Sequence, residues 1–184
     1  MKLKSMLKRF AFSIDRFKRA NRIEKLYFAK EYFECAAICK ESNQSSKGDF
    51  FTHYYLGLSN QKLNLIDESI KNLKDALKHI KNNNSQKSIG KYVNYARHEI
   101  AMSLRKQRKY QEALDEILSF IIFDPNYTSF YIVKAKIYQD LEKSEEAFDS
   151  INEGLRIEPT NTDLLEFKNS LVYFYSVEQV EKRR

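Results

Sequence analysis

Two cysteines and three histidines are the residues of this chain best suited to chemistry. Cys35 and Cys39 lie four residues apart, a spacing that puts both thiols on one face of a helix, where they could bind a metal ion. No histidine or carboxylate cluster lies near them to complete such a site, and thiols one helical turn apart suit a disulfide poorly. We therefore expect both cysteines to be small buried core residues of a reduced, intracellular protein.

The histidines are scattered along the chain. His53, His79 and His98 do not belong to any recognisable nucleophile, metal-binding or phosphate-binding motif. We expect His79 to face solvent, whereas His98 is either structural or in contact with a ligand. No pair of carboxylates stands out from the ordinary Glu and Lys background of helix surfaces. The sequence predicts a protein that is not an enzyme, with no catalytic residues, no metal and no cofactor.

The segments that must position these residues recur with a fixed period of 34 residues. Small and apolar landmarks repeat at that distance, and an earlier copy precedes them by 44 residues because extra polar residues lie at 82–88. Such a period predicts stacked structural repeats, which bury their apolar faces only against their neighbours. The repeated landmarks are Ala101 and Ala135, Glu112 and Glu146, Ala113 and Ala147, Ile117 and Ile151, and Pro125 and Pro159. The predicted units are 16–49, 50–83, 94–127 and 128–161.

Each unit has the pattern of two helices. Apolar residues follow helical spacing, small residues such as Gly57 and Ser69 lie where two helices would cross, and prolines end the later second helices. The chain contains only four Gly and two Pro, and no stretch alternates with the period of a strand. We therefore expect an all-α fold of roughly ten helices. A generic helical bundle is the alternative.

The repeated residues resemble the tetratricopeptide repeat (TPR) family over about residues 16–161. The resemblance rests on Leu56-Gly57, on Ala113-x3-Ile117 and Ala147-x3-Ile151, on Pro125 and Pro159, and on the whole segment 64–77. It implies a right-handed superhelical solenoid of helix-turn-helix repeats. A basic amphipathic segment at 1–15 would precede the repeats, and a capping helix with a basic tail would follow at 162–184. Leu164, Leu165 and Leu171 would cover the last unit.

The resemblance also implies where a partner would bind. The first helix of each unit would line a concave surface, giving an aromatic and apolar floor that suits an extended or helical peptide. The alternative is that the protein itself covers these aromatic rings as core. The places of a chaperone-binding carboxylate clamp carry unsuitable residues, Ala20, Glu24, Leu58, Tyr95 and Glu99, so we do not expect binding of chaperone C-termini. The predicted partner-binding residues are Phe51, Tyr54, Tyr55, Leu58, Tyr95, His98, Met102, Arg105, Ile132 and Lys136.

The net charge of +7 is unevenly distributed. Residues 1–30 contain ten Lys and Arg against two acidic residues, and their apolar residues form one helical stripe. This helix could pack its stripe on the first repeat, lie on an anionic membrane surface, or bind nucleic acid or an acidic protein. The cations of the anionic-surface interpretation are Lys2, Lys4, Lys8, Arg9, Arg16, Lys18 and Arg19.

The sequence thus favours a non-catalytic protein–protein interaction module, an adaptor, scaffold or chaperone, that binds a peptide or helix of another protein in its groove. The alternative is a peripheral membrane- or nucleic-acid-associated assembly factor acting through the basic helix, with nucleic acid the less favoured partner. Residues 171–175 are apolar around most of a turn, so self-association through the C-terminal helix is a further prediction. No apolar run is long enough to cross a membrane, and no secretory signal is recognisable. We expect a cytoplasmic protein, or one at the inner face of a membrane.

Overall fold

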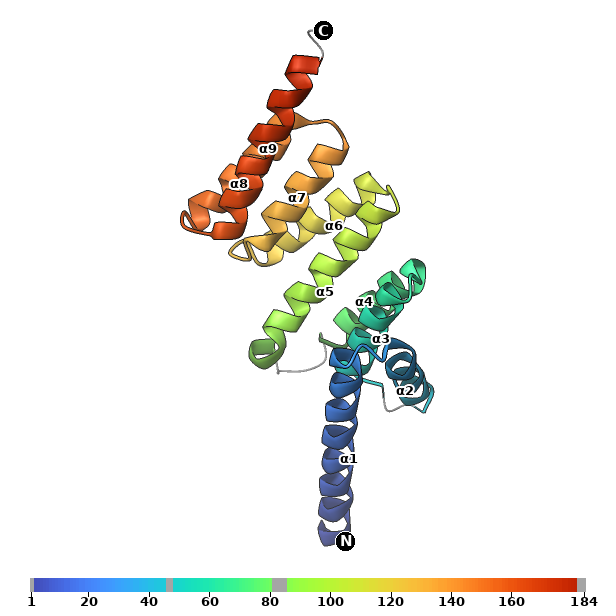
Figure 1. Cartoon of the computed structure of the whole chain (residues 1–184). Helices are drawn as coiled ribbons and strands as arrows, with labels where there is room; N and C mark the ends of the chain where they lie inside the picture. The colour runs from blue at the N-terminus through green and yellow to red at the C-terminus, as the bar shows by residue number, and fades with distance from the viewer. Residues whose placement is uncertain (1, 46–47, 81–85, 182–184) are drawn as a thin grey trace. The chain divides into compact units, whose positions relative to one another are not determined.

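A computed structural model describes residues 2–45, 48–80 and 86–181, and its side chains are described for 15–45, 48–80 and 90–175. This described part is helical, with short turns and no strand (Figure 1). It divides into two compact units, residues 1–90 and 91–184. The helices are α1 (Lys2–Phe28), α2 (Tyr32–Gln44), α3 (Phe50–Lys62), α4 (Ile66–Ile80), α5 (Gln86–Lys106), α6 (Tyr110–Phe123), α7 (Ser129–Asp140), α8 (Ser144–Ile157) and α9 (Thr162–Glu181). The predicted all-α repeat fold is confirmed.

Two helices are longer than the repeat pattern requires. Helix α1 runs without a break through the predicted boundary at residue 15, because no Gly or Pro interrupts residues 2–28. Helix α5 begins at Gln86, eight residues before its repeat unit begins, so part of the extra polar segment extends this helix. The rest of the predicted insertion, 82–85, lies outside the described residues. The merging of the basic segment with the first repeat helix explains why nine helices are described instead of about ten.

The turns inside the four helix pairs repeat the same backbone conformation. One residue in each turn is left-handed: Lys30 (φ 65°), Asn64 (61°), Arg108 (59°) and Glu142 (58°). These positions are separated by 34, 44 and 34 residues, the spacing of the repeats. The N–H that follows each of them donates to the carbonyl five residues back, as Lys109 does to Leu104 at 3.0 Å and Lys143 to Tyr138 at 2.9 Å. The turn therefore satisfies carbonyls that the helix end would leave unpaired.

The small residues of the repeat lie where two helices approach closely. Gly57 is buried, and a Cβ at this position would meet Leu73 Cγ of α4 at 2.6 Å. The equivalent residues Ala101 and Ala135 are fully buried in the second unit. Helices α6 and α8 end two residues before Pro125 and Pro159, as predicted. The predicted packing positions are confirmed.

The C-terminal helix α9 closes the core of the second unit. Leu164 and Leu171 are fully buried against Tyr131, Ala147 and Ile151. Leu165 was predicted to share this role, and that prediction is wrong, since the side chain is 40% exposed. Successive helical residues are 100° apart, so a residue next to the buried Leu164 points away from the same core. None of the described helices has the length and apolar character needed to span a bilayer.

Candidate functional site

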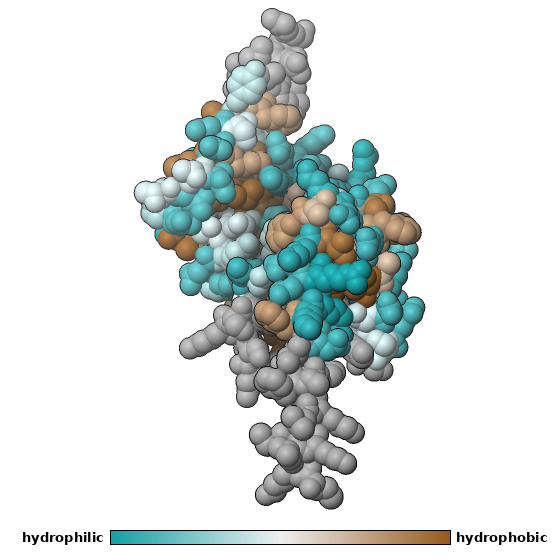
Figure 2. Space-filling view, turned by 60° about the horizontal axis from the view of Figure 1, so that its bottom comes forward, coloured by the Kyte–Doolittle hydropathy of each residue, from teal (hydrophilic) through white to brown (hydrophobic). Residues whose placement is uncertain are grey.

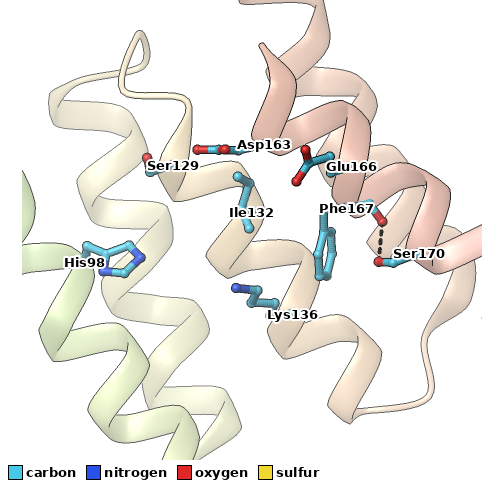
Figure 3. A pocket seen from close by; sticks show the side chains of 8 residues that line it. All are labelled: His98, Ser129, Ile132, Lys136, Asp163, Glu166, Phe167 and Ser170. Carbon is cyan, nitrogen blue, oxygen red and sulfur yellow. Dashed lines mark hydrogen bonds between the residues drawn. The ribbon is translucent and has the colours of Figure 1, made fainter.

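The second unit contains a groove of about 510 Å³. Its walls come from three helices, α5, α7 and α9, and its side chains range from apolar to charged of both signs (Figure 3). The lining residues are His98, Ser129, Ile132, Lys136, Asp163, Glu166, Phe167 and Ser170. A groove of this size and mixed lining can hold a few side chains of a bound segment.

The repeat period explains why these residues meet. His98, Ile132 and Glu166 are separated by 34 residues each, and Lys136 and Ser170 share the same interval. Each therefore occupies an equivalent place on the first helix of its unit, so α9 continues the series as a first helix. Stacking of equivalent helices brings equivalent faces to one surface. The groove thus lies among residues of first helices, where the resemblance placed the expected binding surface; that this surface binds a partner stays a prediction.

Hydrogen bonds at the start of α9 fix one wall of the groove. Asn161 caps the helix, because its Oδ1 accepts the N–H of Leu164 at 3.0 Å. Its Nδ2 donates to Glu158 Oε2 at 2.7 Å and to Thr128 Oγ1 at 3.2 Å. Thr128 directly precedes α7, so one side chain ties the beginnings of α7 and α9 together. These hydrogen bonds keep the first residues of α7 and α9 close together, so Ser129 and Asp163 both line the groove.

An ion pair joins α5 to α7 beside the groove. Arg105 binds Asp140 with two hydrogen bonds, from Nε at 2.6 Å and from Nη2 at 2.9 Å. Two parallel bonds between a guanidinium and a carboxylate hold a fixed geometry. Arg105 was predicted to contact a partner, but its guanidinium group is already bound to Asp140 of the same chain. Its role in the structure is to connect two walls.

Lys136 is the cation of the groove. Its Nζ lies 5.5 Å from the ring centre of Phe167, and no carboxylate of the described chain pairs with it. Burial lowers the pKa of Lys136 from its ordinary value, and the nearby Arg105 lowers it further by repulsion. The contact with the ring offsets part of this cost. Lys136 is thus a half-buried ammonium in a position to bind an anionic group.

The acidic side of the groove comes from α9. In Figure 3 Asp163 and Glu166 lie toward one end of the groove, Lys136 lies toward the other, and Ile132 is between them. Neither carboxylate pairs with a cation in the described chain. Asp163 is in the first turn of α9, where the helix dipole favours a negative charge. Glu166 lies further along the helix, where this stabilisation has faded.

Four of the predicted partner-binding residues lie close to one another on α5 and α7. His98, Ile132 and Lys136 line the groove. Tyr95 is 42% exposed and stacks on His98 with ring centres 6.1 Å apart. Burial raises the pKa of Tyr95, and the nearby Glu99 raises it further. Met102 is half-buried on α5. That these side chains contact a partner stays a prediction.

The first unit differs from the expectation of an open aromatic floor. Tyr54, Tyr55 and Leu58 are only 2–4% exposed, so the expected open position of these three side chains is wrong. Tyr55 contacts Tyr27 of α1, with ring centres 5.4 Å apart, and its hydroxyl donates to Glu24 at 3.2 Å. Tyr54 stacks on Phe50 at 5.6 Å. These rings are core of the first unit. Phe51 beside them is half-buried.

Sequence reasoning missed five residues of the groove: Ser129 at the start of α7, and four residues of α9. Asp163, Glu166, Phe167 and Ser170 complete the groove, but the resemblance ended at residue 161 and this helix was expected only to cap the stack. A signal for them was present. Adding one more period of 34 to Ser129, Ile132 and Lys136 gives Asp163, Glu166 and Ser170.

The described part of the basic segment is largely engaged with the chain itself. Arg16 pairs with Asp49 at 2.7 Å, Arg19 with Asp15 at 3.7 Å, and Arg22 with Glu34 at 3.4 Å. Lys18 is exposed and lines a pocket between α1 and α2. The side chains of Lys2, Lys4, Lys8 and Arg9 lie outside the described residues. Binding of an anionic surface by this segment therefore stays a prediction.

The two cysteines and two of the histidines, His53 and His79, pack within the first unit. Cys35 and Cys39 are fully buried, which confirms the prediction that they are core residues. His79 was expected to face solvent, but it is half-buried and stacks on His53 with ring centres 5.0 Å apart. His53 lies on α3 and His79 on α4, so the ring contact joins these two helices.

Apolar side chains also reach the surface outside the groove. Val172, Tyr173 and Phe174 on α9 are 53%, 73% and 49% exposed, while Leu171 and Tyr175 are buried. Figure 2 shows apolar surface interspersed with polar surface on the face that it draws. Self-association through the outer side of α9 stays a prediction.

Known proteins of similar structure establish the fold. YrrB, described as a TPR protein with an unusual peptide-binding site, superposes with a TM-score of 0.65 at 18% identity, covering 80% of this chain and 71% of its own. A MamA variant from RS-1 gives 0.67 at 14% identity, covering 91% and 89%. The Cut9–Hcn1 tetramer of the APC/C gives 0.68 at 14%, covering 85% and 30%. The chain therefore has the TPR fold.

Two curated proteins from Dictyostelium discoideum show similarity in sequence. Anaphase-promoting complex subunit 3 is 31% identical over 71 residues, which cover 39% of this chain. A homolog of DnaJ homolog subfamily C member 3 is 28% identical over 113 residues, which cover 58% of this chain. The matched regions span 7% and 22% of these two proteins. No family model matches the chain.

Proposed function

We propose that this protein is a non-catalytic interaction module whose second unit binds a peptide or helix of a partner protein in the groove between α5, α7 and α9. The observation that carries the proposal is the groove itself, since equivalent faces of three helices form a hollow in which Lys136, Asp163 and Glu166 have no oppositely charged partner within the described chain. A role as an adaptor or scaffold follows from such binding.

The chemistry of the groove supports a protein ligand. Ile132 and Phe167 provide apolar contact area, and Ser129 and Ser170 provide hydroxyls at the edges. Apolar anchors surrounded by polar groups are typical of sites that bind short protein segments. The fold relative YrrB is described as having a peptide-binding site, which agrees with this use of the fold.

A peptide selection tests the proposal. Random peptides displayed on phage are selected against the whole chain, and the affinities of recovered peptides are measured by titration calorimetry. Ile132→Asp introduces a charge on the groove floor and should weaken binding by about 2 kcal/mol or more if Ile132 is an anchor. Ile122→Asp is the matched control, because Ile122 is 83% exposed on α6 and does not line the groove. Recovered peptides that bind Ile132→Asp as tightly as the native chain would move the site elsewhere.

A second function is favoured by the charge of the first unit. Residues 1–90 contain 18 Lys and Arg against nine Asp and Glu, so this unit could bring the protein to an anionic membrane surface. Flotation with anionic and neutral liposomes tests this second function. Replacing Lys2, Lys4, Lys8 and Arg9 by Gln should reduce recovery with anionic vesicles, and the same four-residue change at Lys71, Lys74, Lys78 and Lys62 is the control for charge alone.

A further inference from the structure

The charges of the groove in the second unit are separated along it. Glu166 and Asp163 come from α9 at one end, and Lys136 comes from α7 at the other. Ile132 lies between the two charged ends in Figure 3, and Phe167 lies next to Lys136. A ligand in this groove therefore passes an acidic end, an apolar middle and a basic end.

Each charged end is unneutralised for a structural reason. Asp140 is the carboxylate on α7 nearest in sequence to Lys136, and Arg105 already binds it with two hydrogen bonds. On α9, Lys168 lies two residues after Glu166 and therefore on another face of the helix, and it donates to Asn152 Oδ1 of α8 at 2.9 Å. The carboxylate of Asp140 and the ammonium group of Lys168 are thus both engaged outside the groove.

Burial makes these unneutralised charges costly. Lys136 is half-buried, and an ammonium in such a place loses hydration that only the ring of Phe167 partly replaces. A ligand that brings a carboxylate to Lys136 restores this loss. The exposed Asp163 and Glu166 contribute less per contact, because water screens them, but they set which charge is tolerated at their end.

We propose that the groove selects its ligand by charge order: it binds a segment of a partner protein that carries a basic side chain at the α9 end, an apolar anchor over Ile132 and Phe167, and an acidic group at Lys136. This inference rests on the proposed function, since it specifies the ligand of the same groove. It makes the ligand a zwitterionic peptide segment and disfavours segments of uniform charge.

Charge reversal tests the inference. The phage selection is run in parallel on the native chain, on the double variant Asp163→Lys/Glu166→Lys, and on Lys136→Glu. We expect native-selected peptides to carry a basic and an acidic residue on opposite sides of an apolar residue. The double variant should select acidic residues in place of the basic one, and Lys136→Glu should select basic residues in place of the acidic one.

Affinities give the expected size of the effect. The probe is the tightest native-selected peptide, synthesised with capped ends, and an analogue in which its two charged residues are exchanged. The exchanged analogue should bind the native chain roughly five- to tenfold more weakly, as expected for partly exposed ion pairs. The controls Glu145→Lys and Lys143→Glu alter the same charge types at exposed positions outside the groove and should leave both affinities unchanged.

The outcomes separate this inference from the proposed function. Peptides that need Ile132 but show no charge order, or whose charge order does not change in the variants, would overturn the inference and leave the proposed function intact. Recovery of no peptide that needs Ile132 would overturn both. If a reversal variant fails to fold by circular dichroism, Lys136→Gln or the double variant Asp163→Asn/Glu166→Gln replaces it, and each should abolish the charge preference at its own end.

Discussion

The two units of this protein share one repeat pattern but use the same positions differently. In the first unit, Tyr54 and Leu58 of α3 are buried. The equivalent positions of α7 in the second unit are Ile132 and Lys136, which line an open groove. The charges differ too: the first unit carries +9, whereas residues 91–184 contain 14 basic and 16 acidic residues, a charge of −2. The repeat pattern determines which residues pack between helices, and the residues on the remaining face determine whether it is core or site.

The largest effect that would sharpen this comparison comes from truncating equivalent residues of the two units. Tyr54→Ala should destabilise the protein by about 3 kcal/mol or more, because a buried aromatic ring leaves a cavity. Ile132→Ala should cost on the order of 1 kcal/mol, since the side chain is only half-buried at the edge of the core. Urea unfolding followed by circular dichroism measures both. If both variants lost the same unfolding free energy, Tyr54 and Ile132 would both be core residues, and the two units would not use this face differently.

Adding a methyl group should destabilise the protein at the helix crossing of the first unit but not at an exposed helix position. Gly57→Ala should cost about 1–3 kcal/mol, because the added methyl group meets Leu73 at 2.6 Å. Gly90→Ala is the matched control. It has open space around its Cβ position in α5, and Ala should stabilise that helix by about 0.5–1 kcal/mol. The second unit already has Ala101 and Ala135 at the positions equivalent to Gly57. If Gly57→Ala stabilised the protein, α3 and α4 would not approach each other too closely for a Cβ atom at residue 57.

Substitutions in the turns should have the same effect in both units, because all four turns share one backbone conformation. The difference between the units should therefore be confined to the face of the first helices. Lys30→Gly and Glu142→Gly should each stabilise by about 0.5–1 kcal/mol, because glycine relieves a left-handed conformation that other residues adopt at a cost. Asn64→Gly should gain less, since asparagine tolerates this conformation. Thermal unfolding of the three variants measures the differences. A gain in only one unit would show that the turns are not equivalent.

The smallest effect that we expect is a pH dependence confined to the first unit. Burial lowers the pKa of His53 below its ordinary value of 6.5, and repulsion from His79 adds to this. The unfolded chain then binds the proton more readily, so this stability is present above pH 6.5 and is lost as pH falls through the lowered pKa. His53→Gln should flatten the unfolding free energy between neutral pH and pH 5. The same slope in the variant would assign the dependence to other groups.

Sequence reasoning predicted the fold because the repeat period reports packing. Gly57, Ala101 and Ala113 were placed correctly, since a small residue at a helix crossing is required by geometry whatever surrounds it. The open or buried state of Tyr55 was not predictable in this way. It depends on whether Tyr27 and Glu24, about 30 residues earlier on α1, reach the same face.

The candidate site was predicted in part for a similar reason. Ile132 and Lys136 were found because the resemblance covers their helix. Glu166 and Phe167 were missed because no second helix follows α9 in the described residues, so this segment did not match the complete pattern of a unit. The polarity of the groove also depends on Arg105 binding Asp140, a contact between α5 and α7 that no local pattern reports.

The recurring left-handed turns also affect the speed and order of folding. Each turn is closed by hydrogen bonds between residues no more than five positions apart. Neighbouring helices therefore meet after closing only a short loop, which costs little chain entropy and takes well under a millisecond for small elements. No long-range strand pairing has to form first within the described chain. A chain built in this way can begin to fold at any of its helix pairs and then extend to the neighbouring pairs, so folding can start before the last helix has been synthesised.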